Sequence, residues 1–166
     1  DSMVLLDLLM NLVKESDQLR VVHINHNLNE YSDDWAQFSS KVCEKYDLPL
    51  INASVKPKRQ GKGLEAEARA LRYQSFREII QDNEYLLTGH HQDDQMETLL
   101  YRIFRGTGIG GLRAIRRKTK FGKGFLYRPM LNVSRDKIEE YAHLKNLKWI
   151  CDSSNDDSNY DRNFLR

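Results

Sequence analysis

Acidic and histidine side chains gather between residues 90 and 97, in the order His-His-Gln-Asp-Asp-Gln-Met-Glu. The apolar run Tyr-Leu-Leu at 85–87 comes just before them and is typical of a buried strand. Apolar residues then recur at helical spacing at positions 96, 99, 100, 103 and 104, which predicts a helix with one apolar face. The residues that could do chemistry therefore fall where a strand ends and a helix begins, which is where ligands bind in open α/β sheets.

Two interpretations of this cluster fit the residue types. Asp94 and Glu97 are three positions apart on the expected helix, so both carboxylates can reach one hard cation. The spacing of zinc ligands is absent, so Mg²⁺ fits the cluster better than Zn²⁺. Alternatively, Asp93 or Asp94 only caps the helix, and Glu97 lies on its solvated face.

The elements that must position these residues alternate along the chain. Helices are expected at residues 1–13, 33–46, 64–81 and 93–104, and strands at 20–25, 49–55 and 85–88. This alternation predicts an α/β fold in which one parallel sheet is flanked by helices. The first helix is apolar nearly all round, so we expect it to be buried on most sides.

A small α+β extension is expected after the parallel sheet. Residues 118–130 predict a hairpin that turns at 122–124, and Ser134 is expected to cap a helix that ends near Leu144. A short strand is expected at 148–150, followed by a polar loop.

Length and composition exclude several classes of protein. The 166 residues are enough for one domain with a core, and 40% hydrophobic and 30% charged residues are ordinary for a globular chain. No apolar run approaches the roughly 20 residues of a membrane span. Cys43 and Cys151 are the only cysteines and form no disulfide framework, which favours a cytoplasmic location.

The net charge is only +2, but the positive charge is concentrated in one part of the chain. No acidic residue occurs between Glu97 and Asp136, and this basic interval contains Arg102, Arg105, Arg113, Arg116, Arg117, Lys118, Lys120, Lys123, Arg128 and Arg135. A surface of this kind attracts phosphates or RNA. The alternative is a solvated face that is balanced by acids elsewhere in the fold.

Three more cations lie outside this interval at positions that suit phosphate binding. His26 follows the first expected strand, although a lone histidine is more often structural. Arg69 and Arg72 are one turn apart on the third expected helix, where Arg69 could instead pair with Glu65.

Six blocks of sequence together resemble one known family. They are His-Ile-Asn-His-Asn-Leu (23–28), Glu-Ala-Glu-Ala-Arg-Ala-Leu-Arg-Tyr (65–73), His-His-Gln-Asp-Asp-Gln-Met-Glu-Thr (90–98), Arg-Gly-Thr-Gly-Ile-Gly-Gly-Leu (105–112), Arg-Pro-Met-Leu-Asn-Val-Ser-Arg (128–135) and the segment from Asp-Ser-Ser-Asn to Asp-Arg-Asn-Phe-Leu-Arg (152–166). In this order they resemble the bacterial tRNA(Ile)-lysidine synthetases, which belong to the N-type ATP pyrophosphatases of the PP-loop superfamily. The resemblance extends over the whole chain.

The resemblance implies an adenine nucleotide α-hydrolase-like fold, with residues 1–117 as the ATP pyrophosphatase core and 118–166 as a small subdomain of the same catalytic unit. The family's phosphate loop reads Ser-Gly-Gly-x-Asp-Ser, and Asp1-Ser2 matches its last two positions. The rest of that loop and the strand before it are not in this sequence. Two other departures are Asn27, where glycine is common, and Asn29, where arginine is common.

The activity that the resemblance implies is the ATP-dependent conversion of the wobble cytidine of an isoleucine tRNA to lysidine. ATP first adenylates the cytidine, and the amine of free L-lysine then displaces AMP. The implied cofactors are ATP and Mg²⁺, and the implied partner is tRNA(Ile) with a CAU anticodon. Two alternatives are another PP-loop tRNA-modifying enzyme and a non-catalytic module that binds nucleotide or RNA.

Site residues carry over from the resemblance position by position. Asp1, Asp94, Glu97 and Arg162 are expected to be catalytic, and Asp1, Asp94 and Glu97 also to bind the metal. The residues expected to bind ATP are Asp1, Ser2, His26, Arg69, Arg72 and His90. Those expected to bind tRNA are Arg105, Arg113, Arg116, Arg117 and Lys118.

Arg162 is the boldest of these assignments. The family block Arg-Asn-x-x-Arg is matched completely by residues 162–166, and an arginine fork suits a phosphate better than a lysine does. We expect Arg162, with Arg69 or Arg72, to face Asp94. The alternative is a surface arginine paired with a nearby aspartate.

Overall fold

The computed structural model describes residues 1–13, 18–27, 31–57 and 64–150, apart from the side chain of Glu65. The chain forms two compact units. The first unit contains Asp1–Leu8, Tyr85–Phe121 and the residues from Phe125 onward, and the second contains Leu9–Glu84 and Gly122–Gly124. The division of function at residues 117 and 118 stays a prediction.

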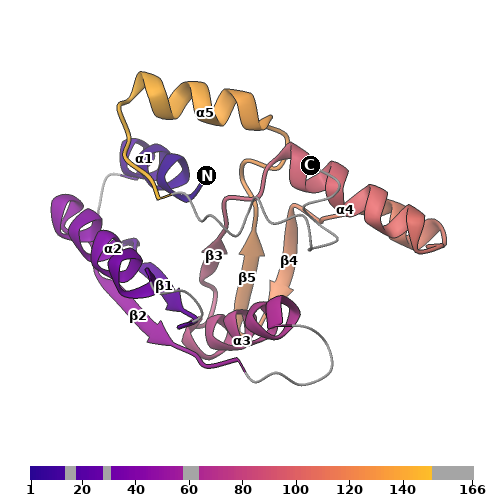
Figure 1. Cartoon of the computed structure of the whole chain (residues 1–166), viewed down its shortest axis with the longest axis horizontal. Coiled ribbons are helices and arrows are strands. Elements are labelled where there is room, and N and C mark those ends of the chain that lie inside the picture. The colour runs from indigo at the N-terminus through magenta and orange to yellow at the C-terminus, as the bar shows by residue number, and fades with distance from the viewer. Residues whose placement is uncertain (14–17, 28–30, 58–63, 151–166) are drawn as a thin grey trace. The chain divides into compact units, whose positions relative to one another are not determined.

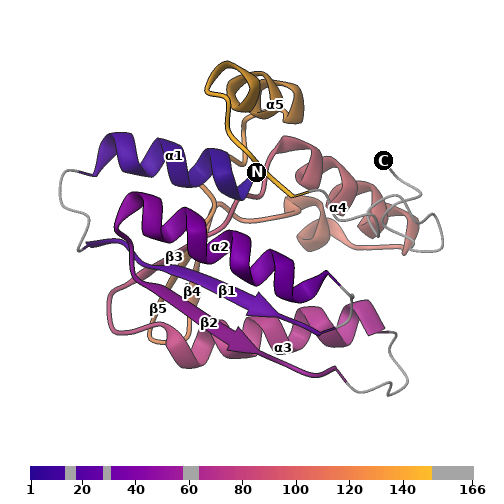
Figure 2. The same ribbon diagram turned by 60° about the vertical axis from the view of Figure 1, so that its left-hand side comes forward.

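The second unit contains a strand–helix–strand motif with both strands parallel. Strands β1 (Val21–Asn25) and β2 (Leu50–Ser54) pair in the register Val21↔Leu50 to Asn25↔Ser54. Helix α2 (Ser32–Tyr46) connects them and lies along both strands (Figure 2). Helix α3 (Leu64–Ile79) follows. The buried apolar residues of this unit are Ile24, Cys43, Leu48, Ala68 and Ile80.

The first unit is organised around a three-stranded sheet in the order β3-β5-β4 (Figure 1). Strand β3 (Tyr85–Leu87) runs parallel to β5 (Gly124–Tyr127), with Tyr85 opposite Phe125 and Leu87 opposite Tyr127. A two-residue turn joins β4 (Lys118–Phe121) to β5, so these two strands form the expected hairpin. The buried apolar residues of this unit are Val4, Leu5, Phe121, Leu126, Met130, Leu131, Ile138 and Ala142.

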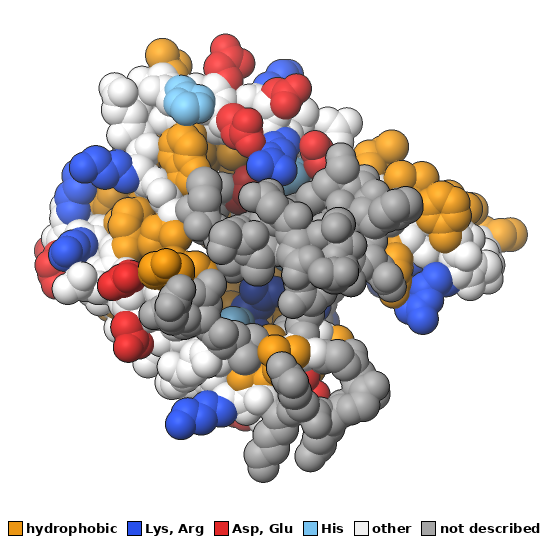
Figure 3. Space-filling model, in the orientation of Figure 1, with side chains coloured by type: hydrophobic (Ala, Val, Ile, Leu, Met, Phe, Trp, Pro, Cys, Tyr) orange, Lys and Arg blue, Asp and Glu red, His pale blue; other side chains and the backbone are white. Residues whose placement is uncertain are grey.

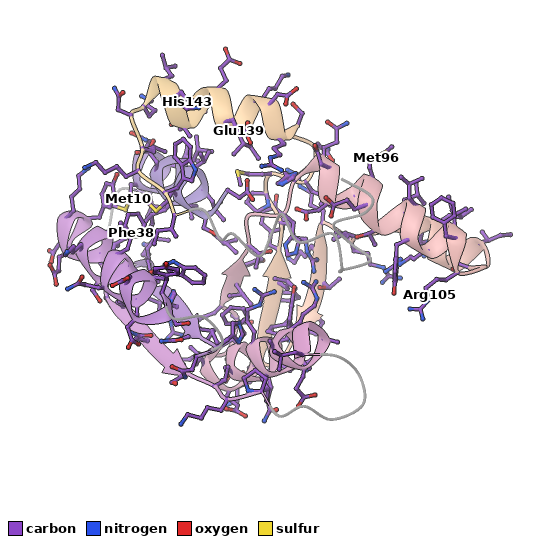
Figure 4. All side chains as sticks on the ribbon, viewed as in Figure 1. Met10, Phe38, Met96, Arg105, Glu139 and His143 are labelled. Carbon is purple, nitrogen blue, oxygen red and sulfur yellow. The ribbon has the colours of Figure 1, made fainter. Side chains whose placement is uncertain are left out.

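Helical elements complete the first unit. Helix α4 (Gln92–Phe104) follows β3 and leads to the 3₁₀ helix η2 (Ile109–Arg113). Helix α5 (Arg135–Leu144) is the last helix in the described part of the chain, and Ser134 is at its N-cap position as expected, although its side chain makes no capping hydrogen bond. Helix α1 (Ser2–Leu12) starts in this unit and ends in the other, where Met10 lies beside Phe38 of α2 (Figure 4).

The α/β class and the parallel pairing are confirmed, but the expected single sheet is wrong. In the described residues, β1 and β2 form one sheet and β3 belongs to the other. The alternation of strands and helices predicts parallel strands without specifying which strands are neighbours, and β3 takes β5 as its parallel partner. The hairpin of the expected extension is thus part of the β3 sheet.

Two smaller expectations are also wrong. Residues 148–150 form no strand. Helix α1 buries only Val4 and Leu5, and Leu12 near its end is 77% exposed. The helix expected at 93–104 is present as α4, and its apolar face is partly at the surface, since Met96 is 54% and Phe104 is 74% exposed (Figure 3). Within the described residues, no helix has the length and the apolar character needed to cross a membrane.

Candidate active site

The candidate site begins where β3 ends, at a close approach between Gly89 and the start of α1. A Cβ atom on Gly89 would lie 3.1 Å from the Cβ of Asp1 and 3.3 Å from the backbone nitrogen of Ser2. A side chain here would therefore push the start of α1 away from the end of the strand. The first turn of a helix has unpaired N–H groups and a positive dipole end, so Asp1 and Ser2 flank a position that favours an anion.

His91 connects this helix start to the start of α4. Its ring is buried, with 4% of the residue exposed. The Nε2 atom lies 3.7 Å from Oδ2 of Asp1 and 3.6 Å from Oδ2 of Asp94, and Nδ1 lies 3.8 Å from Oδ1 of Asp93. Three carboxylates from two elements thus surround one imidazole. No hydrogen-bond partner of Nδ1 is found among the described residues.

Asp94 and Asp93 have separate structural contacts. The backbone N–H of His91, at the N-cap position of α4, donates to Oδ2 of Asp94 at 3.0 Å. Asp94 therefore does cap α4, although from the third helical position rather than from the N-cap itself. Oδ1 of Asp93 accepts from the backbone N–H of Arg135 at 3.2 Å, so Asp93 ties the start of α4 to the start of α5.

Glu97 is buried, with 7% of the residue exposed, so the alternative that it lies on a solvated face is wrong. The charge of Glu97 acts on Arg135, whose Nε atom lies 2.7 Å from Oε1 of Glu139. The hydrogen bond to Glu139 raises the pKa of Arg135 most, and the charges of Glu139, Asp93 and Glu97 raise it further. Arg135 thus offsets part of the negative charge of the site.

The residues expected to hold a metal ion are only partly assembled. Asp1 and Asp94 converge on His91, and Glu97 follows one turn further along α4. Among the described residues, no group of three or more His, Cys, Asp or Glu side chains is placed to hold a metal ion. The magnesium site therefore stays a prediction.

Of the residues expected to bind ATP, Asp1, Ser2 and His90 belong to the first unit. The Nδ1 atom of His90 lies 2.8 Å from Oγ1 of Thr88, the residue after β3. This contact ties the ring of His90 to a residue two positions earlier in the chain. The buried histidine among the carboxylates is instead His91. The sequence offered two adjacent histidines and no local pattern that distinguishes them.

The other residues expected to bind ATP, His26, Arg69 and Arg72, belong to the second unit. Burial lowers the pKa of His26 most, and the charges of Arg72 and His23 lower it further. Arg69 is exposed and lies over the ring of Tyr73 at 5.1 Å. The side chain of Glu65 is not among those that the structure describes, so the alternative pairing of Arg69 with Glu65 stays a prediction.

Asn27, where the family commonly has glycine, has a φ of 51°. Glycine is the residue that adopts this left-handed conformation most readily, and asparagine is one of the few others that tolerate it. The side chain of Asn27 also donates to Oγ of Ser54 at 2.6 Å, which ties the end of β1 to the end of β2. The departure from glycine is therefore compatible with the backbone geometry of this turn.

The basic interval contains both structural and exposed cations. Arg102 donates to the carbonyls of Gly111 and Ala114 at 3.1 and 3.0 Å, which fixes η2 to α4. Arg128 donates to the carbonyl of Arg116 at 2.6 Å. The five residues expected to bind tRNA are all exposed: Arg105, Arg113, Arg116, Arg117 and Lys118. Arg105, labelled with Met96 in Figure 4, lies over the ring of Tyr101 at 5.1 Å.

Sequence reasoning missed the local roles of Gly89, His91 and Arg135. Only Gly89 carried a signal, because a glycine directly after a strand often marks close approach of another backbone segment. Arg162 lies outside the described residues, so its proposed position opposite Asp94 stays a prediction.

Comparison with known proteins defines the class of this fold and site. A family model described as the PP-loop domain matches residues 1–166, and the chain belongs to this family. Membership implies that the domain binds ATP.

Curated relatives give the comparison more detail. The chain is 49% identical over 166 residues to a tRNA(Ile)-lysidine synthase of Actinobacillus pleuropneumoniae serotype 3 (strain JL03), covering 100% of this chain and 39% of the relative. It is 42% identical over 149 residues to a protein of the same name from Proteus mirabilis (strain HI4320), covering 90% and 34%. A third, from Pseudomonas syringae pv. tomato (strain ATCC BAA-871 / DC3000), is 42% identical over 168 residues, covering 100% and 38%. The chain thus spans less than two fifths of the length of these relatives.

Proposed function

We propose that this chain is the ATP-dependent catalytic domain of an enzyme that makes lysidine at the wobble cytidine of a tRNA(Ile) with a CAU anticodon. The observation that carries the proposal is the approach of Asp1, at the start of α1, and Asp94, at the start of α4, to the buried His91. This arrangement combines an anion-binding helix start with two carboxylates, which is what a magnesium nucleotide requires. The names of the relatives support the choice of tRNA and reaction.

Mg²⁺ fits the side chains that meet here. It is usually bound in nucleotide sites by one or two carboxylates together with phosphate oxygens and waters, so a pair of carboxylates is sufficient. Asp1 is the more accessible of the pair, because 49% of its side chain is exposed, whereas Asp94 is held by the N–H group of His91. When bound, Mg²⁺ would neutralise charge on the triphosphate and on the leaving pyrophosphate.

The proposed reaction consists of two displacements. O2 of the cytidine attacks the α-phosphorus of ATP, and the bond to the β-phosphate oxygen breaks, so pyrophosphate leaves. The lysine amine, after losing a proton, attacks C2, and the C2–O2 bond breaks, so AMP leaves with that oxygen.

The chain's own residues would assist these steps in different ways. The N-terminus of α1 would bind phosphate oxygens, and Arg162 would bind the AMP phosphate. The carboxylate of Glu97 would stabilise the positive charge of the lysine ammonium group. His26, His90, Arg69 and Arg72 would contact the nucleotide. A cytoplasmic setting, predicted because two cysteines form no disulfide framework in the sequence, and the division of the catalytic unit at residues 117 and 118 are parts of the same proposal.

The proposal is tested by measuring ATP–pyrophosphate exchange and lysine incorporation separately. Exchange that requires the CAU-containing tRNA, followed by incorporation of labelled lysine into that tRNA, is the expected result. Exchange with tRNA but without lysine incorporation would indicate another PP-loop tRNA-modifying enzyme. Binding of ATP without any exchange would indicate a non-catalytic module.

The exposed part of the basic interval is proposed to hold the tRNA backbone. Arg113 is the last residue of η2, Arg116 lies between η2 and β4, and both are exposed. Replacing both with Gln should reduce the slope of log affinity against log salt by about 0.7 to 0.9 for each phosphate that is no longer neutralised. An unchanged slope after both replacements would place the tRNA on another surface.

A further inference from the structure

A second candidate for RNA recognition lies on the sheet of the first unit, next to the candidate active site. Side chains of β3, β5 and β4 alternate between the two faces of this sheet. One face presents Tyr85, Phe125 and Tyr127 together with Lys118 and Lys120. Arg117, just before β4, lies over the ring of Tyr127, and we call this set of residues the basic aromatic face. In the two strands of the hairpin, Phe121 and Leu126 alternate with these residues and are buried, so their side chains lie on the other face of the sheet.

The three rings form a continuous aromatic surface. Tyr85 and Phe125 are opposite each other in the parallel register and stack with ring centroids 5.5 Å apart. Tyr127 meets Tyr85 edge to face at 6.4 Å. Tyr85 is 52% exposed, so part of this aromatic surface is accessible to a ligand.

Cations lie over these rings. The Nζ atom of Lys118 is 4.7 Å from the Tyr85 centroid and 4.3 Å from the Phe125 centroid, and it donates to the Tyr85 hydroxyl at 2.8 Å. Lys120 lies 4.7 Å from the Phe125 centroid, and Arg117 lies 5.6 Å from the Tyr127 centroid. All three basic residues are exposed. The hairpin at 118–127 contains no acidic residue, so its charge complements a polyanion.

We propose that the basic aromatic face binds unpaired nucleotides of an RNA, with a base stacked on the aromatic rings and phosphates held by Arg117, Lys118 and Lys120. Exposed aromatic rings combined with basic side chains are what single-stranded RNA-binding surfaces use, because every base has a π face and every linkage has a charge. This inference rests on the proposed function for its RNA, and it adds an anchoring surface to the active-site contacts.

The face is continuous with the candidate active site along the backbone. The N–H group of Thr88 donates to the carbonyl of Tyr127 at 3.2 Å, and the Thr88 hydroxyl contacts His90. Nucleotides on the aromatic rings would therefore be bound on the same sheet that ends at Gly89 and His91. An acidic peptide could satisfy the cations, but it would supply no base to stack on the exposed part of the aromatic rings.

The experiment measures binding of a fluorescent anticodon stem-loop RNA, with the CAU anticodon, to the protein by anisotropy over a range of salt. Tyr85→Leu removes the ring and should weaken binding about 5- to 100-fold, whereas Tyr85→Phe keeps the ring and should bind nearly as wild type. Replacing Lys118 and Lys120 with Gln should reduce the salt slope by about 0.7 for each phosphate that is no longer neutralised. The matched control replaces Lys41 of α2 and Lys137 of α5, which are also exposed, and should leave affinity and slope unchanged.

A second readout tests proximity directly. A 5-iodouridine placed in the RNA loop should form photo-crosslinks to Tyr85, Phe125 or Tyr127, as identified by mass spectrometry of the peptides. Crosslinks only to peptides outside these strands would overturn the proposal. Equal loss of affinity in Tyr85→Phe and Tyr85→Leu would also contradict it, because stacking would then not be the cause.

Lysine incorporation measured on the same samples distinguishes this proposal from the proposed function. If wild-type protein incorporates lysine and Tyr85→Leu binds RNA normally, only the basic aromatic face is refuted. If the wild-type protein crosslinks through the three aromatic residues but neither exchanges pyrophosphate nor incorporates lysine, the face stands and the proposed function fails.

Discussion

Substitutions of Asp94 can separate the two roles that its position allows. One carboxylate oxygen accepts the N–H group of His91 and caps α4, and the same group is proposed to bind the magnesium nucleotide. Asparagine keeps an acceptor oxygen for the cap but loses the charge. Alanine loses both. The prediction is that Asp94→Asn abolishes tRNA-dependent ATP–pyrophosphate exchange with little loss of stability, whereas Asp94→Ala also destabilises the fold.

The magnitudes follow from the surroundings of the residue. Asp94 is only 6% exposed, so solvent screens its interactions weakly. Losing the anion at the helix start costs about 0.3 to 1 kcal/mol of unfolding free energy. Losing the cap and leaving a buried N–H group unpaired costs about 2 to 3 kcal/mol. For a chain of this size, 1 kcal/mol shifts the melting temperature by about 2 to 4 °C.

The assay combines thermal unfolding with exchange kinetics, and Asp93→Asn is the matched control on the same helical turn. We expect Asp94→Asn to lower the exchange rate by at least roughly 100-fold, as removal of one electrostatic interaction with a reacting group does. Asp93 is half-exposed and contacts the backbone of Arg135, so its replacement should change neither quantity much. If Asp94→Asn exchanged pyrophosphate as fast as wild type, Asp94 would be a helix cap and nothing more.

Particular contacts elsewhere in the molecule lead to three more predictions. Gly89→Ala should destabilise the protein by about 1 to 3 kcal/mol and weaken ATP binding, because the new methyl group would crowd the backbone of Asp1. Thermal unfolding and ATP titration measure the two effects, and unchanged values would refute the prediction. Arg102→Met should cost about 1 to 3 kcal/mol and speed proteolysis between residues 106 and 114, since two carbonyls lose a donor; an unchanged cleavage pattern would argue against it. Burial lowers the pKa values of His23 and His26 in the folded protein, so the unfolded chain binds protons first, and stability is lost, as the pH falls below about 6.5. Over this pH range the melting temperature should fall less in a variant with both His23→Gln and His26→Gln than in wild type. Equal falls would show that these two histidines do not cause the loss.

The helices and strands were largely predictable because their signals are local. Helix α2 was expected at 33–46 and is Ser32–Tyr46, and the turn of the hairpin falls where its glycines predicted it. The partner of β3 was not predictable in this way. Its three residues pair with residues of β5 that lie forty positions later, and no periodicity in the sequence encodes that choice.

The candidate site was predictable in its residue types but not in its contacts. The acidic cluster and the start of α4 were found from spacing, because helix starts and carboxylates have sequence signals. Which of two adjacent histidines is buried depends on the approach of α1 to Gly89, a contact between segments almost ninety residues apart. The aromatic rings beneath Lys118 were likewise invisible, because they come from two strands that meet only in the folded sheet.

The central claim is that this domain attaches lysine to the wobble cytidine of a tRNA, and nucleoside analysis tests it most directly. A tRNA(Ile) transcript with a CAU anticodon is incubated with the protein, ATP, Mg²⁺ and isotopically labelled lysine, then digested and analysed by mass spectrometry. The expected product is a labelled nucleoside with the mass of cytidine plus lysine minus water, formed only with ATP and absent with Asp94→Asn. Unmodified cytidine in a reaction where the protein has bound both ATP and the tRNA would contradict the claim.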